Sequence, residues 1–136
     1  MSGKRHTARE MAVQMLYQHD LGGSPLPQVF HHFDLGDYLT PDEAAAAGAG
    51  DRREESEKVR RRVREAFEHA RALVEGAAAH REEIDQLIRS QADNWRLERM
   101  PAVDRNILRL AVYELLHQPD VPKLVVLDEA IELAKK

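Results

Sequence analysis

The segment between Pro101 and Pro119 constrains the fold more than any other part of this 136-residue chain. Its apolar side chains recur at helical spacing and cover more than half of the helix circumference. They are Val103, Ile107, Leu108, Leu110, Ala111, Leu115 and Leu116. A helix that is apolar on so many sides has to be surrounded by other elements. We therefore expect a helical bundle with this segment at its centre.

Five further segments carry the signals of helices. The first is expected from Thr7 to about Leu21, with Thr7 and Glu10 forming a capping box at its start. The others are expected over residues 28–38, 54–76, 80–95 and 124–136, with Gly76 as a break near the end of the long third helix. The predicted fold class is all-α, with about six helices. Residues 124–127 taken alone would also suit a strand.

One stretch, residues 40–51, has no periodic apolar face and consists of proline, alanine, glycine and acidic residues. Such a composition is typical of a linker. We expect it to divide a single domain, residues 1–136, into an amino-terminal helical subdomain over 1–39 and a carboxy-terminal helical subdomain over 52–136.

Composition excludes several classes of protein. The chain has no cysteine, which excludes a disulfide scaffold, a cysteine nucleophile and thiolate zinc sites. Its aromatic content of 5% requires an aliphatic core and so favours helices over a β-sandwich. No apolar run is long enough to span a membrane, and no apolar stretch of the signal-peptide kind follows the basic amino end. We expect a cytoplasmic protein that does not contact membranes.

No arrangement of residues indicates catalysis. The sequence Gly48-Ala49-Gly50 does not follow a strand, so it lacks the frame of a phosphate-binding loop. The seven histidines include no His-Glu-x-x-His motif, and the adjacent His31 and His32 point in different directions on a helix. We expect surface histidines, no catalytic residue, no cofactor and no metal site.

The positive signal is the distribution of arginine, which outnumbers lysine fifteen to five although the net charge is −4. Arginine binds phosphate through two parallel hydrogen bonds and stacks on bases, so this excess points towards RNA. The cations form two groups, one over residues 4–9 and one over residues 52–64. The alternative for Arg60 to Arg64 is that they only keep a helix soluble.

Three sequence stretches together resemble the NusB family of bacterial transcription antitermination factors. The longest is residues 94–115, NWRLERMPAVDRNILRLAVYEL. The second is Pro122 followed by residues 127–135, LDEAIELAK. The third comprises positions of the first helix, namely Arg9, Ala12, Gln14, Leu16 and Tyr17. Three motifs in the family's order are more specific than any one of them.

The resemblance implies an all-helical, two-subdomain protein without catalytic activity. It would bind the boxA element of nascent ribosomal RNA together with a small-subunit ribosomal protein, within an antitermination complex on RNA polymerase. By the same resemblance, the RNA-binding residues would be Lys4, Arg5, Arg9 and Gln14. The residues facing the protein partner would be Asp104, Arg105 and Tyr17.

The chain departs from the family's pattern at three places. His6 and Thr7 stand where arginines are common, and Asp128 replaces a usual asparagine. Family members also continue past the lysine pair, whereas this chain ends at Lys136. We therefore expect a fold that lacks the family's final carboxy-terminal helix.

Other interpretations remain open from the sequence. The chain could be an RNA-binding module related to ribosomal RNA methyltransferases, or a structural helical protein that self-associates, for example as a homodimer. Tyr17 and Trp95 could be core residues. Arg105 and Arg109 could simply pair with Glu98 or Glu114 in their own helix region.

Overall fold

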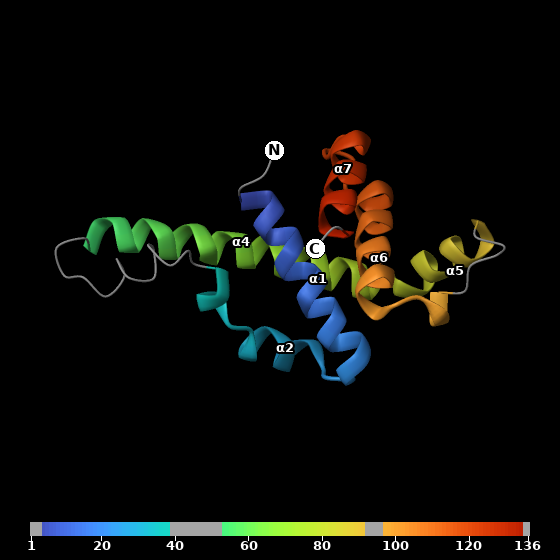
Figure 1. Cartoon of the computed structure of the whole chain (residues 1–136), viewed down its shortest axis with the longest axis horizontal. Helices are drawn as coiled ribbons and strands as arrows, with labels where there is room; N and C mark the ends of the chain where they lie inside the picture. Colours follow the sequence, from blue (N-terminus) through green and yellow to red (C-terminus); the bar gives the residue numbers. More distant parts are fainter. Residues whose placement is uncertain (1–3, 39–52, 92–96, 135–136) are drawn as a thin grey trace.

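The computed structural model describes residues 4–38, 53–91 and 97–134, and all regular elements in these ranges are helices (Figure 1). In chain order they are α1 (Lys4–Gly22), α2 (Leu26–His32), the 3-10 helix η1 (Leu35–Tyr38), α4 (Arg53–Ala79), α5 (Arg81–Gln91), the 3-10 helix η3 (Leu97–Arg99), α6 (Ala102–His117) and α7 (Lys123–Ala134). The predicted all-α class is confirmed for the described residues. Residues 124–127 lie within α7, so the strand alternative is wrong.

The long helix α4 runs along the longest axis of the molecule, and α1 crosses it (Figure 1). Helices α6 and α7 stand side by side near the carboxy-terminal end of α4, and α5 leads away from the same end. The central position expected for residues 101–119 is confirmed, since α6 packs against α1, α4, α5 and α7. The ends of α6 are less covered, because Val103 and Leu116 are 44% and 46% exposed.

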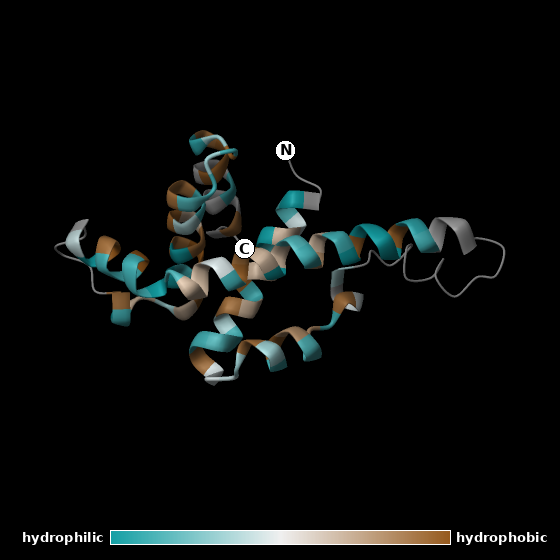
Figure 2. Cartoon of the chain, turned by 180° about the vertical axis from the view of Figure 1, so that it is seen from behind, coloured by the Kyte–Doolittle hydropathy of each residue, from teal (hydrophilic) through white to brown (hydrophobic). Residues whose placement is uncertain are grey.

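A single hydrophobic core joins the helices on either side of residues 40–51. Met11 and Met15 of α1 are fully buried together with Ala70 and Val74 of α4 and Leu110 of α6. Viewed from behind, apolar residues follow the inner faces where these helices meet, and polar residues cover the free length of α4 (Figure 2). The expected linker and Trp95 lie outside the described residues.

Helix α1 begins at Lys4, three residues before the expected capping box. Thr7 is therefore inside the first turns, and the prediction that it caps the helix is wrong. His6 pairs with Glu10 one turn later at 3.2 Å, and it also reaches Glu129 of α7 at 2.5 Å. These side-chain contacts hold the first turn in helical form without a cap.

The expected helix over residues 28–38 is two shorter elements, α2 and η1. The backbone of Phe33 is extended, and the Gly36 N–H donates a hydrogen bond to the Asp34 carboxylate at 2.9 Å. This local bond competes with the continuation of the helix. Phe33 then stacks on Phe67 of α4 and on Tyr38, so the break directs apolar side chains towards α4.

Gly76 does not break its helix, because α4 continues to Ala79. A Cβ atom at Gly76 would lie 2.0 Å from the hydroxyl oxygen of Tyr113 on α6. The glycine is thus needed for the close approach of α4 and α6. None of the described helices is both long enough and apolar enough to cross a membrane.

Candidate nucleic-acid interface

Helix α1 is held to α6 and α7 by a buried group of charged side chains, here named the Arg9 cluster: His6, Arg9, Glu114 and Glu129. The Arg9 Nε donates to both carboxylate oxygens of Glu114 at 3.2 and 3.0 Å, and its Nη2 donates to one of them at 2.9 Å. Both residues are 2% exposed. The remaining Arg9 nitrogen, Nη1, lies 4.0 Å from Glu129. Such a bidentate pair is strong and fixed in direction.

A second group, here named the Asp20 cluster, joins the other end of α1 to α5 and α6. The Asp20 carboxylate accepts hydrogen bonds from Arg105 at 2.6 Å, Asn106 at 3.1 Å and Arg109 at 3.0 Å. Arg109 also donates two hydrogen bonds to Asp85 of α5, at 2.9 and 3.1 Å. Arg81 lies 3.5 Å from Asp20.

The protonation of Asp20 reflects these neighbours. Burial alone would raise the pKa of this carboxyl, but the hydrogen bonds from Arg105 and Asn106 and the charges of Arg109 and Arg105 outweigh it. Together they lower the pKa from 3.8 to about 2. The carboxylate of Asp20 therefore stays ionised well into acid conditions.

The position of Arg9 corrects one prediction made from the sequence. A guanidinium that is 2% exposed and bonded to Glu114 cannot also reach a phosphate. Helical spacing pointed to Arg9 as a basic residue on the first helix, but it did not reveal that its acidic partner lies 105 residues away. Arg9 is a structural residue in this fold.

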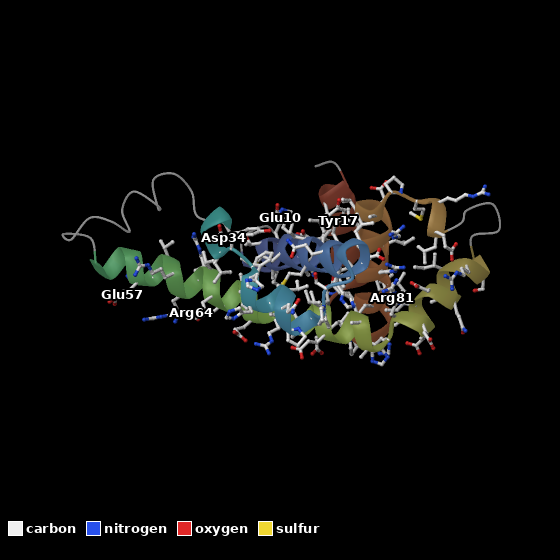
Figure 3. The ribbon with its side chains drawn as sticks, turned by 90° about the horizontal axis from the view of Figure 1, so that it is seen from below. Glu10, Tyr17, Asp34, Glu57, Arg64 and Arg81 are labelled. Atoms are coloured by element: carbon white, nitrogen blue, oxygen red, sulfur yellow. The ribbon has the colours of Figure 1, made fainter. Side chains whose placement is uncertain are left out.

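The other residues expected at RNA do lie at the surface. Arg5 and Gln14 are exposed, but about two and a half helical turns separate them, so they lie on opposite sides of α1. Lys4 begins α1, and its side chain lies outside the described part. The exposed arginines of the second basic group are on α4, where Figure 3 shows Arg64 on the outer side of the helix.

The residues expected at a protein partner lie around one place, where the start of α6 meets the second half of α1. Asp104 is exposed in the first turn of α6. Its neighbour Arg105 bonds to Asp20, and Tyr17 is half-buried one turn before Asp20. Figure 3 shows Tyr17 on the side of α1 away from α4. Arg105 and Arg109 pair with Asp20 and Asp85, and not with Glu98 or Glu114.

Sequence reasoning missed the acidic residues of both clusters. One signal was available: Arg9 and Asp20 are eleven residues apart, about three helical turns, so they share one side of α1. Two opposite charges at this spacing beside an apolar stripe indicate a helix that binds a partner helix through both ends. The partners themselves are not visible in the sequence, because they lie on α5, α6 and α7.

Comparison with known proteins decides the family. The family model described as "NusB family" matches residues 6–136. A curated transcription antitermination protein NusB of Myxococcus xanthus is 42% identical over 133 residues, which cover 98% of this chain and 81% of that protein. The corresponding protein of Symbiobacterium thermophilum is 45% identical over 131 residues, covering 96% and 76%. The chain belongs to the NusB family.

Solved structures agree with this assignment. The T. maritima NusB structure superposes with a TM-score of 0.70 at 31% identity, covering 99% of this chain and 79% of that one. A chain in the "Crystal Structure of a Plectonemic RNA Supercoil" gives 0.71 at 27% identity, covering 98% and 81%. The resemblance predicted from the three motifs is confirmed, and so is the fold that it implied.

The Arg9 cluster generates a prediction about stability. Replacing Arg9 by alanine leaves the buried Glu114 carboxylate without its partner, so we expect a loss of roughly 3–5 kcal/mol in the free energy of unfolding. Urea denaturation followed by circular dichroism measures it. The matched control is Arg5→Ala, an exposed arginine on the same helix, which should change stability by less than about 0.5 kcal/mol. Equal effects of the two variants would contradict the structural role of Arg9.

The Asp20 cluster generates a prediction about pH. Because folding lowers the pKa of Asp20 to about 2, the ionised carboxylate stabilises the fold above about pH 4, and this stabilisation is lost as the pH falls towards 2. We expect Asp20→Asn to remove about 2 kcal/mol of the acid-dependent change in the free energy of unfolding. Urea titrations across this range measure it, and Asp120→Asn, in an exposed turn, should leave the change as it is in the unaltered protein. An undiminished acid dependence in Asp20→Asn would sink this assignment.

Proposed function

We propose that this protein is an RNA-binding transcription antitermination factor that binds boxA RNA of nascent ribosomal transcripts together with a small-subunit ribosomal protein. The observation that carries the proposal is membership of the NusB family over nearly the whole chain, at 42–45% identity to proteins named for antitermination. The surfaces described above give the two binding partners separate places on the molecule.

The start of α1 is the proposed RNA contact. Arg5 is exposed there, and the first N–H groups of α1 add the positive end of the helix dipole. Gln14 offers a neutral hydrogen-bonding group farther along the helix. Since Arg9 is buried, the site has fewer cations than the sequence suggested, and we expect RNA binding by the isolated protein to be weak and to need the ribosomal partner.

The surface around the start of α6 is the proposed contact with the ribosomal protein. Asp104 and Val103 are exposed next to each other, with Tyr17 half-buried nearby. An acidic side chain beside apolar and aromatic groups suits a basic protein partner. The Asp20 cluster lies directly beneath, so this surface is held in place by Arg105 and Asn106.

The RNA contact is tested by the salt dependence of binding. Replacing Arg5 by alanine removes one phosphate contact, so the slope of log affinity against log salt should flatten by about 1. Fluorescence anisotropy with boxA RNA, with and without the ribosomal protein, measures the slope. The comparison variant Arg60→Ala with Arg61→Ala changes exposed arginines of α4 and should flatten the slope less. A larger effect of the α4 variant would place the RNA on α4 instead.

The protein contact is tested by reversing a charge. Asp104→Lys should weaken the complex with the ribosomal protein, since it puts like charge against a basic surface. The fold should stay intact, because an exposed first-turn charge contributes only about 0.3–1 kcal/mol to its helix. Calorimetric titration measures the affinity, and Asp120→Lys, an equal charge change beyond the other end of α6, is the matched control. Identical affinities for the two variants would remove Asp104 from the interface.

A further inference from the structure

Three side chains capable of binding a metal ion meet at the end of the bundle opposite Asp104 on α6. His80 lies at the junction of α4 and α5, Glu83 lies on α5, and His117 is the last residue of α6. Their ligand atoms all lie within 4.8 Å of one another. Nε2 of His117 is 2.7 Å from the Glu83 carboxylate, and Nδ1 of His80 is 3.7 Å from the same oxygen. One carboxylate thus lies against both imidazoles.

The two imidazoles are positioned by the packing of α4 against α6. Their rings stack with centroids 3.9 Å apart, and the ring of Tyr113 stacks against both, at 6.2 Å from His80 and 5.5 Å from His117. Tyr113 is itself held by the close approach at Gly76 and by a hydrogen bond from Gln118 at 3.3 Å. Gly76 and His80, like Tyr113 and His117, are one helical turn apart, so the contact that fixes the helices also brings the histidines together.

We propose that His80, Glu83 and His117 form a binding site for a divalent transition-metal ion of the Zn²⁺ type. Two imidazoles and one carboxylate are a donor set that Zn²⁺ accepts, with a fourth position left for water. Ligand atoms around tetrahedral Zn²⁺ lie about 3.3 Å apart, given metal–ligand distances of about 2.0 Å. The group needs to close by roughly 1.5 Å, through a tilt of the rings and rotation of Glu83, whose side chain is 57% exposed.

The site is independent of the proposed RNA and protein contacts. An ion bound there would link the α4–α5 junction to the carboxy-terminal end of α6, whereas Asp104 lies at the other end of α6 and Arg5 at the start of α1. Sequence spacing did not indicate this group, because His117 is more than thirty residues from its partners and no His-Glu-x-x-His motif exists. The expectation that the chain holds no metal site is therefore replaced by a specific one.

Titration of the full chain with ZnCl₂ in chelator-free buffer tests the proposal. Isothermal calorimetry should give one Zn²⁺ per chain, and either His117→Ala or Glu83→Gln should weaken binding by about tenfold or more. The control is His31→Ala, which alters one of two adjacent exposed histidines on α2 and should bind as the unaltered protein does. Circular dichroism of each variant checks its helix content, and Glu83→Gln changes only a surface side chain.

A spectroscopic measurement adds a readout that a structural role alone would not move. Co²⁺ used in place of Zn²⁺ should show the intense visible absorption of a tetrahedral site in the unaltered protein and lose it in His117→Ala. Zn²⁺ should also raise the melting temperature of the unaltered protein and not that of Glu83→Gln, because ligand binding stabilises the folded state. The proposal is overturned if no Zn²⁺ binds, or if binding survives unchanged in both site variants.

Discussion

The pairing of charged side chains between α1 and α6 is the constraint on which the rest of the structure depends. Arg9 and Asp20 share one side of α1, and they meet Glu114 at one end of α6 and Arg105 and Arg109 towards the other. A buried ion pair adds little net stability compared with apolar packing, but breaking one is costly. Sliding α1 by one turn would leave both charges buried without partners. The pairs therefore fix which way and how far α1 lies along the bundle, while the methionines and alanines of its other side supply the hydrophobic core.

The sequence predicted what depends on local periodicity. The helices, the central place of α6 and the exposure of His31 and His32 follow from which residues recur every three or four positions. The start of α1 and the role of Gly76 did not follow. In both cases a side chain from a distant helix decides the outcome: Glu129 supports the first turn of α1, and Tyr113 occupies the space that a Cβ of residue 76 would need.

The functional residues divide in the same way. Motif similarity found the family, because a motif survives without knowledge of contacts. Placing individual residues required the structure, since Arg9 resembles a phosphate ligand in sequence and is a core residue in space. Asp104 needed no such correction, because a short acidic residue that follows a proline at the start of a helix is exposed by its position alone. Charged residues of amphipathic helices are thus the least predictable part of the site.

The separation in sequence between α1 and its charged partners has a consequence for how the chain is made. Helix α1 leaves the ribosome first, yet Glu114 and Glu129 follow it by 105 and more than 110 residues. Contacts of such long range form late, because the loop between them has to close before they contribute. Until then the methionine face of α1 has no stable cover, and the nascent chain exposes it to solvent and to chaperones. Synthesis of the last helix is thus the step that completes the first one.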